Sequence, residues 1–187
     1  RDKIESSFTD ADRIKWGRRL EASIAQGLAE ENEWEIKPMK DYRRIDELKI
    51  GSSFDFEIIG DEPAILEVKN VDYLRYRDTW IVKDGVCTDA PAHIELQIRH
   101  QMLISGYKKG YIGALVAGNQ SVLIPREANE VIHKEIIKRD TYFWSAVHNN
   151  VEPKPDFERD AEFIAKHYTP EKGKSIEASQ DICDLAR

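Results

Sequence analysis

The chain has 187 residues, 41% of them hydrophobic, and this length and apolar content predict one folded domain rather than a disordered chain. Its formal net charge of −7 is not the basic balance typical of DNA-binding domains, although a nuclease can combine acidic catalytic groups with local basic strips. Two cysteines are too few for a four-cysteine zinc site or an iron–sulfur cluster, and no apolar run approaches the length of a membrane-spanning helix, so we expect a cytoplasmic protein without membrane contact.

The N-terminal part of the chain is predicted to form one helix and two short strands. Thr9 or Asp10 can cap a helix that runs to about residue 32, because apolar residues recur along it at helical spacing. Residues 34–38 have the pattern of a short strand at the edge of a sheet, and residues 42–45 have that of another strand.

Residues 53–69 have the pattern of a β-hairpin. Apolar and polar residues alternate, so that Phe54, Phe56 and Ile58 lie on one face, whereas the other face carries Ser53, Asp55 and Glu57. The Gly-Asp-Glu-Pro sequence of residues 60–63 is typical of a turn. Residues 65–69 are then predicted to form the returning strand.

The second half of the chain is predicted to contain helices and a second hairpin. Residues 71–90 are expected to have little regular structure, and a helix follows from Pro91 to a glycine stop at Gly106. The remaining elements are a hairpin over residues 110–125 around Gly118 and Asn119, an amphipathic helix over residues 127–149, a break at Pro153 and Pro155, and a helix over about residues 156–168.

This order of elements predicts an α/β fold with a mixed central β-sheet flanked by α-helices. We expect a single domain over residues 1–187, with its core at about residues 9–150. The helix at about residues 156–168 and a loosely held tail would complete the chain.

Three Glu-x-Lys triplets occur in the sequence: Glu35-Ile36-Lys37, Glu47-Leu48-Lys49 and Glu67-Val68-Lys69. A strand places residues i and i+2 on one face, so Glu67 and Lys69 project together while the apolar residues beside them face the core. If both apolar rows of the hairpin meet one core, Asp55 and Glu57 share the polar face with them. The other two triplets lack an acid-bearing strand beside them, and we interpret them as surface charge.

The grouping of Asp55, Glu67 and Lys69 predicts metal-assisted chemistry. Two neighbouring carboxylates repel each other unless a cation or a proton lies between them, and a site with oxygen ligands alone suits Mg²⁺ or Mn²⁺. A lysine beside such a metal can orient water or stabilise charge on a phosphate. For Asp55 to stand near Glu67 or Lys69, the hairpin connection must contain an odd number of residues or a bulge.

These residues resemble the PD-(D/E)xK nuclease core and, more narrowly, the lambda-exonuclease (YqaJ-type) viral recombinase family. The resemblance covers about residues 16–144 and includes three segments in the same order, namely "GRRLEASIA", "SSFDFEI" with "LEVKN", and "PAHIELQIRHQMLISG". The first contains Glu21 after Gly17, and the last contains Gln97, which matches the glutamine of the family's helix. Relatives often have glycine after the motif aspartate, where this chain has Phe56.

The resemblance implies a restriction-endonuclease-like fold and a Mg²⁺-dependent nuclease, with 5′-to-3′ exonuclease action on linear double-stranded DNA in recombination or phage DNA processing. The residues implied to hold the metal are Asp55, Glu67, the carbonyl of Val68, and Glu21 as an aid to the metal or to a water. Lys69 would position the attacking water, and Gln97 would orient Lys69 or that water. Mn²⁺ is expected to substitute for Mg²⁺.

The family also implies partners and a setting. Its best-known member is a ring-shaped trimer around DNA that works with a single-strand annealing protein, in the cytoplasm of a bacterial or phage-infected cell. Two alternatives stay open, an endonuclease of the same superfamily and a non-catalytic acidic interaction domain on the same fold. The basic and aromatic residues of the segment 73–83 would either contact DNA or form mixed surface charge; they are Tyr73, Arg75, Tyr76, Arg77, Trp80 and Lys83.

Overall fold

The computed structural model describes residues 11–157, 159–167, 173 and 175. The chain divides into two compact units, Arg1–Ser145 and Ala146–Arg187, which are treated separately below. The predicted helix caps Thr9 and Asp10, the predicted end of the last helix at residue 168, and most of the predicted tail lie outside the described residues.

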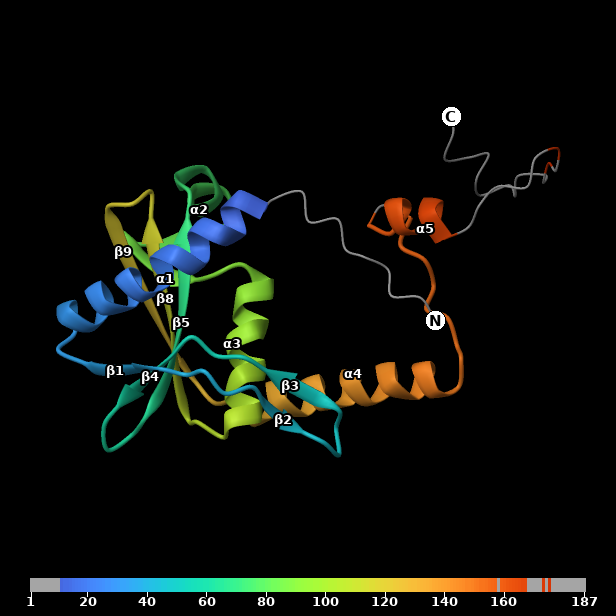
Figure 1. Ribbon diagram of the computed structural model, residues 1–187, viewed down its shortest axis with the longest axis horizontal. Coiled ribbons are helices and arrows are strands. Elements are labelled where there is room, and N and C mark those ends of the chain that lie inside the picture. Colours follow the sequence, from blue (N-terminus) through green and yellow to red (C-terminus); the bar gives the residue numbers. More distant parts are fainter. Residues whose placement is uncertain (1–10, 158, 168–172, 174, 176–187) are drawn as a thin grey trace. The chain divides into compact units, whose positions relative to one another are not determined.

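A five-stranded mixed sheet forms the centre of the first unit (Figure 1). Its strands, in their order across the sheet, are β1 (Glu35–Pro38), β4 (Phe56–Ile59), β5 (Ala64–Val71), β8 (Lys109–Val116) and β9 (Gln120–Glu127). The strands β5 and β8 run parallel, whereas every other neighbouring pair is antiparallel. The predicted mixed sheet is therefore confirmed, and so is the edge position of β1.

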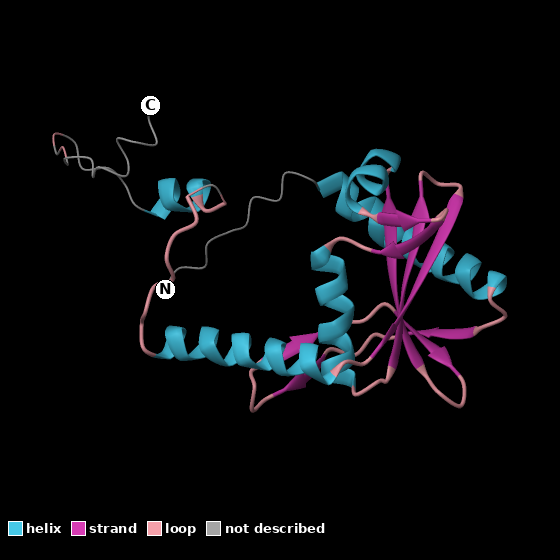
Figure 2. Ribbon diagram, turned by 180° about the vertical axis from the view of Figure 1, so that it is seen from behind, coloured by secondary structure: helices cyan, strands magenta, loops and turns pink. Residues whose placement is uncertain are grey.

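Helices cover both faces of this sheet, as Figure 2 shows from behind. The helix α1 (Ala11–Glu31) packs Leu28 and its neighbours on one face, and α3 (Ala92–Ser105) packs Ile98 and its neighbours on the other. Burying one such aliphatic side chain contributes about 1.5–3 kcal/mol, so the two apolar layers hold both helices against the sheet. Gly106 ends α3 with a left-handed φ of 76°, as predicted.

The hairpin β4–β5 differs from the prediction in the residue at which its first strand begins. Phe56 and Ile58 lie in the core beneath α1, but Phe54 lies in the core beneath α3, so the predicted alternation that placed all three on one face is wrong. The reason is that residues before Phe56 come from a separate two-stranded ribbon, β2 (Arg43–Ile45) and β3 (Ile50–Ser52), which packs against α3. The chain therefore changes direction before it enters the sheet.

The connection between β4 and β5 contains an odd number of residues, as predicted. Ile58 stands opposite Ala64, so the connecting residues 59–63 are odd in number. The last pair at the other end of the ladder is Phe56 opposite Leu66, and the β5 residues beyond Leu66 therefore have no partner on β4.

The expectation of little regular structure over residues 71–90 is wrong. This segment contains the helix α2 (Tyr73–Thr79) and a hairpin of β6 (Ile81–Lys83) and β7 (Val86–Asp89). The carboxylate of Asp72 caps α2 by accepting the Arg75 N–H at 2.9 Å. Asp84 and Gly85 have φ values of 52° and 79°, which match a tight hairpin turn, so the Asp-Gly dipeptide was a signal that could have predicted it.

The second predicted hairpin is formed by β8 and β9, and its turn lies one residue earlier than expected. Ala117 and Gly118 have φ values of 51° and 77°, and the Asn119 N–H closes the turn by donating to the Val116 carbonyl at 3.1 Å. The helix α4 (Glu130–His148) begins later than its predicted start at residue 127, because β9 continues to Glu127.

The second unit has one short helix, α5 (Ala161–His167), among its described residues. It begins later than the predicted residue 156, since Asp156 and Asp160 first form a capped turn in which the Asp160 N–H donates to the Asp156 carbonyl at 2.7 Å. Among all described residues of the chain, no helix is both long and apolar enough to cross a membrane.

Candidate active site

One open groove of about 990 Å³ brings together every site residue predicted from the sequence. These residues are Glu21, Asp55, Glu67, Val68, Lys69 and Gln97. They come from α1, from the segment that enters β4, from β5 and from α3. Residues up to 76 positions apart in the sequence therefore meet in one polar groove.

The strand β5 places Glu67 and Lys69 on the face that α3 covers. The Lys69 ammonium donates to Glu67 Oε1 and to Gln97 Oε1, the latter at 3.1 Å. The Gln97 amide also donates to Glu67 Oε1 at 2.6 Å. Lys69 is thus held by a carboxylate from its own strand and an amide from the helix, as expected if Gln97 orients it.

Glu67 is buried, with 1% of its surface exposed. From the sequence we expected Glu67 to lie on a polar face of β5, with a core against the other face alone. In the structure both faces of β5 are apolar and covered by helices. Glu67 is therefore a carboxylate inserted into the layer beneath α3, where burial must be offset by hydrogen bonds. Its second oxygen, Oε2, accepts the Gln101 amide at 2.6 Å. Gln101 was missed as a site residue, although it lies one helical turn after Gln97, on the same face.

Asp55 approaches the site from the unpaired end of β4. Its Oδ2 accepts the backbone N–H of Val68 at 2.8 Å, so the carboxylate takes the place that a neighbouring strand would occupy. Burial and the nearby Glu67 carboxylate raise the pKa of Asp55 to about 7, although the Val68 N–H acts in the opposite direction. A proton or a cation at this position would relieve the repulsion.

Glu21 reaches the groove from α1. Partial burial raises the pKa of Glu21, and the Glu67 carboxylate raises it further, while Lys69 and Arg18 lower it. This electrostatic coupling indicates that Glu21 faces the same group of charges as Glu67 and Lys69.

Two charged residues of the alternative triplets lie elsewhere, as predicted. Lys37 on β1 pairs with Glu57 on β4 at 3.1 Å, and the Lys49 ammonium lies 5.3 Å from the ring centre of Trp144. Glu57 shares a face with Glu67 because it stands opposite Ile65, but its partner is Lys37 and it does not line the groove.

The donors in the groove fit a hard divalent cation in their chemistry. Asp55, Glu67 and Glu21 supply carboxylate oxygens, and Val68 adds a backbone carbonyl, which is the ligand type that Mg²⁺ and Mn²⁺ prefer. Within the described part of the chain, however, no three Asp, Glu, His or Cys side chains are close enough to hold a metal as they stand. Lys69 and Gln97 engage Glu67 Oε1, so these two donors must shift, and the other carboxylates must turn, for an ion to bind.

The aromatic residues proposed for base stacking divide into two groups. Tyr76 and Trp80 are buried in the core beneath α3, and burial raises the pKa of Tyr76 to about 12, so these two rings are structural. Tyr73, Arg75 and Arg77 are exposed on α2, and Lys83 is exposed on β6. Only this second group is available to contact a ligand.

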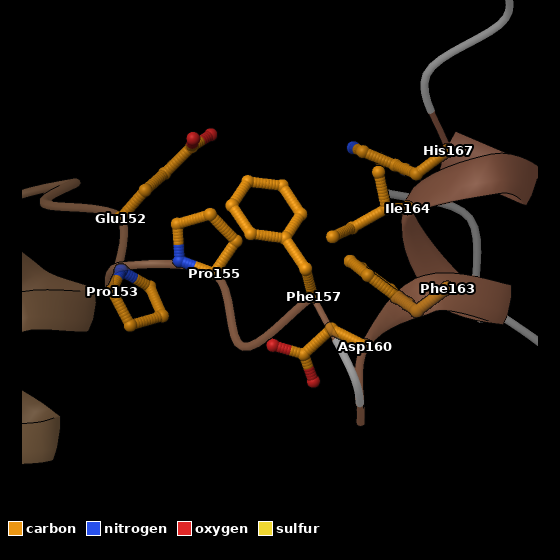
Figure 3. A pocket seen from close by; sticks show the side chains of 8 residues that line it. All are labelled: Glu152, Pro153, Pro155, Phe157, Asp160, Phe163, Ile164 and His167. Atoms are coloured by element: carbon orange, nitrogen blue, oxygen red, sulfur yellow. The ribbon is translucent and has the colours of Figure 1, made fainter. Parts of the chain in front are cut away.

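The second unit contains a separate pocket of about 470 Å³ (Figure 3). Its wall is mainly apolar and includes Pro153, Pro155, Phe157 and Phe163. None of the residues predicted to carry chemistry lines it, and its polar lining residues, Glu152, Asp160 and His167, do not include a lysine like the one in the groove. The groove is therefore the better candidate for an active site.

Comparisons with known proteins agree with this architecture. Residues 1–108 match the model of the YqaJ-like viral recombinase domain. The structure is similar to the crystal structure of an alkaline exonuclease, LHK-Exo, from Laribacter hongkongensis, with a TM-score of 0.52 and 16% identity over 88% of this chain and 78% of that chain. LHK-Exo in complex with dAMP gives a TM-score of 0.51 and 15% identity, with the same coverage. No curated protein sequence is significantly similar to the chain. At these identities the structural likeness shows a shared fold, which confirms the predicted restriction-endonuclease-like architecture.

Proposed function

Because the chain belongs to the YqaJ-like viral recombinase domain family, we propose that it is a metal-dependent deoxyribonuclease that degrades linear double-stranded DNA from its ends in the 5′-to-3′ direction. The observation that carries this proposal is the convergence of Glu21, Asp55, Glu67, Lys69 and Gln97 in one groove. The structural likeness to an alkaline exonuclease, also solved with dAMP, supports a DNA strand as the substrate.

The proposed roles of the residues follow from their positions. Asp55, Glu67, the Val68 carbonyl and Glu21 would hold Mg²⁺, with Mn²⁺ as a substitute, once Lys69 and Gln97 shift from Glu67 Oε1. When bound, the cation supplies charge neutralisation at the phosphate and an acidified water. Lys69, oriented by Gln97, would donate a hydrogen bond to that water or to the phosphate.

The charge balance of the groove supports a role for a cation. Four carboxylate residues line it, namely Glu21, Asp55, Glu67 and Asp72, whereas Lys69 and Arg18 supply the positive charge among its lining residues. A DNA phosphate would be repelled by such a surface unless a divalent ion lay between the carboxylates and the phosphate. Metal binding and DNA binding at this site are therefore expected to be coupled.

A comparison of DNA substrates tests the proposal. The protein is incubated with Mg²⁺ and with 5′-phosphorylated linear, 5′-hydroxyl linear or covalently closed circular duplexes, and EDTA serves as the control. We expect loss of the linear duplexes, release of nucleotides from the 5′ ends and survival of the circle. Cleavage of the circle would identify an endonuclease instead, and survival of all substrates in both Mg²⁺ and Mn²⁺ would leave the acidic interaction domain as the better interpretation.

The family resemblance also extends the proposal to assembly. We expect a ring-shaped trimer around DNA and cooperation with a single-strand annealing protein, in the cytoplasm of a bacterial or phage-infected cell. Sedimentation analysis at several protein concentrations measures the first of these features, and a pull-down with a purified annealing protein measures the second.

A further inference from the structure

The helix α3 carries a second glutamine, Gln101, one turn after Gln97. Its side chain is 1% exposed, and its amide nitrogen donates to Glu67 Oε2 at 2.6 Å and to the Ser53 carbonyl at 3.1 Å. Ser53 lies two residues before Asp55. The single amide group of Gln101 therefore bonds both to β5, which carries Glu67, and to the segment before β4, which carries Asp55.

The orientation of this amide is determined by its neighbours. Both of its N–H groups have an acceptor, one being the Glu67 carboxylate and the other the Ser53 carbonyl. If the amide were rotated by half a turn, its oxygen would face two other oxygens at these distances, and the contacts would be repulsive. Gln101 can therefore act here only as a donor to Glu67.

The amide oxygen of Gln101 is the unfavourable part of the arrangement. Gln101 Oε1 is buried and has no hydrogen-bond partner among the described residues, which costs free energy because the atom loses its contact with water. The flanking buried positions of α3 on this side are apolar, for example Ile98 and Met102. A leucine or methionine would suit the packing without this cost, so the amide is better explained by its service to Glu67 than by the stability of the core.

We propose that Gln101 is a positioning residue that holds the carboxylate of Glu67 in the orientation needed for cation binding, an inference that rests on the nuclease function proposed above. Lys69 and Gln97 both donate to Oε1 of Glu67. Within the described part of the chain, Gln101 is the side chain that donates to Oε2. Without it, Glu67 Oε2 loses its hydrogen bond and the carboxylate is held through Oε1 alone, while the link from Glu67 to the Asp55 segment through the Ser53 carbonyl is lost.

The test uses the substitution Gln101→Met, which keeps the volume of the side chain and removes both donors. Mn²⁺ affinity is measured by calorimetry without DNA, and cleavage of linear duplex DNA is measured with Mg²⁺. We expect Mn²⁺ binding to weaken by about tenfold and kcat to fall by about tenfold or more, with KM for DNA changed little, because outer partners of metal ligands typically act on this scale. The substitution Gln101→Asn, which is too short to reach both acceptors, is expected to give an intermediate loss and serves if the methionine variant does not fold.

The matched control is Ile98→Val on the same helix. Ile98 is fully buried beneath the sheet but makes none of the hydrogen bonds to Glu67. The control should lower the thermal stability of the protein and leave both Mn²⁺ affinity and kcat within about twofold, because its effect is confined to packing. An equal loss of Mn²⁺ affinity in this variant would mean that Gln101 acts only through stability and would overturn the proposal.

Metal-free crystal structures of the wild type and of Gln101→Met separate this inference from the function beneath it. We expect the Glu67 carboxylate to leave its wild-type position in the variant. If the wild type neither binds Mn²⁺ nor cleaves DNA, the proposed function fails, and the position of Glu67 in the two structures still decides whether Gln101 holds it. An unchanged Glu67 carboxylate in the variant, or unchanged Mn²⁺ affinity and cleavage, would overturn the positioning role.

Discussion

The carboxylate of Asp55 accepts the backbone N–H of Val68 at 2.8 Å, just beyond the point where the ladder between β4 and β5 ends. In a longer hairpin that N–H would bond to a strand carbonyl. Here the short β4 releases it, and a side chain that also faces Glu67 takes its place. Because the ladder between β4 and β5 ends at Phe56, the Val68 N–H is available as a donor, and the Asp55 carboxylate can lie beside Glu67.

The substitution Asp55→Asn is expected to abolish cleavage and to stabilise the metal-free protein. The asparagine oxygen can still accept the Val68 N–H, while the repulsion with Glu67 disappears. The pKa of Asp55 is about 7 in the folded state, above its usual value of 3.8, so the folded state binds this proton more tightly than the unfolded state does. The stability of the wild type should therefore fall between about pH 4 and pH 7 and stay level above pH 7.

Urea unfolding in EDTA at pH 5 and pH 8 measures this effect. At pH 8 we expect the Asp55→Asn variant to be more stable than the wild type by about 1–3 kcal/mol, with a smaller difference at pH 5. A variant less stable than the wild type at pH 8 would show that the ionised carboxylate is not a source of repulsion in the folded protein.

Replacement of Lys69 by methionine is expected to reduce cleavage by about 100-fold or more, because the donor to the water or phosphate is lost. It should also destabilise the fold by about 2–4 kcal/mol, since Glu67 is left buried without its cation. The control is Lys49→Met, because Lys49 lies outside the groove and faces Trp144. Cleavage kinetics and urea unfolding of the two variants provide the comparison, and equal losses of activity in both would contradict the assignment of Lys69.

Arg126 is expected to be a structural residue that fastens the β6–β7 hairpin to the rest of the first unit. Its side chain is 12% exposed and donates to the Thr88 carbonyl at 2.9 Å and to Glu95 Oε2 at 2.7 Å. Replacing it with leucine should cost about 2–4 kcal/mol because Glu95 loses its partner in a partly buried site. The exposed pair of Arg139 with Glu135 provides the control, and Arg139→Leu should change stability by less than about 0.5 kcal/mol in the same urea experiment.

Gly113 on β8 lies against the side chain of Leu28 on α1. A Cβ atom at this position would overlap Leu28 Cδ1 and lie 3.1 Å from Leu66 Cδ1, both in the core beneath α1. Gly113→Ala should therefore displace α1, destabilise the protein by about 1–3 kcal/mol and lower cleavage, because α1 carries Glu21.

The glycine at position 27 provides the matched control for this prediction. A Cβ atom there meets nothing within 4 Å, and alanine is a better helix former than glycine. Gly27→Ala should therefore stabilise the protein by about 0.5–1 kcal/mol and leave cleavage unchanged. Thermal unfolding and cleavage assays check both variants, and an active Gly113→Ala protein of wild-type stability would refute the close-packing argument.

Three residues of the candidate site, Asp55, Glu67 and Lys69, could be predicted from local patterns. Glu67 and Lys69 share a face because the backbone of any strand turns alternate side chains to the same side, and the odd connection over residues 59–63 places Asp55 near them. Glu21 and Gln97, by contrast, were implied only by the resemblance to the YqaJ-type family, because the local patterns of α1 and α3 do not distinguish them from surface residues. The helix α2 and the β6–β7 hairpin in residues 71–90 were not predicted, although local signals for both are present. Asp72 caps the helix, and Asp84-Gly85 forms the turn of the hairpin.

The sequence by itself determined which residues project together from β5 and which segments form the helices and hairpins, because backbone periodicity and turn chemistry act over a few residues. Only the tertiary structure decided that both faces of β5 are covered, that Glu67 is buried and that Gln101 bonds to it. It also decided that Phe54 turns to the α3 side and that Tyr76 and Trp80 are core residues. These outcomes depend on contacts between segments far apart in the chain. The spacing of polar and apolar residues within one segment does not show which distant segment it will contact.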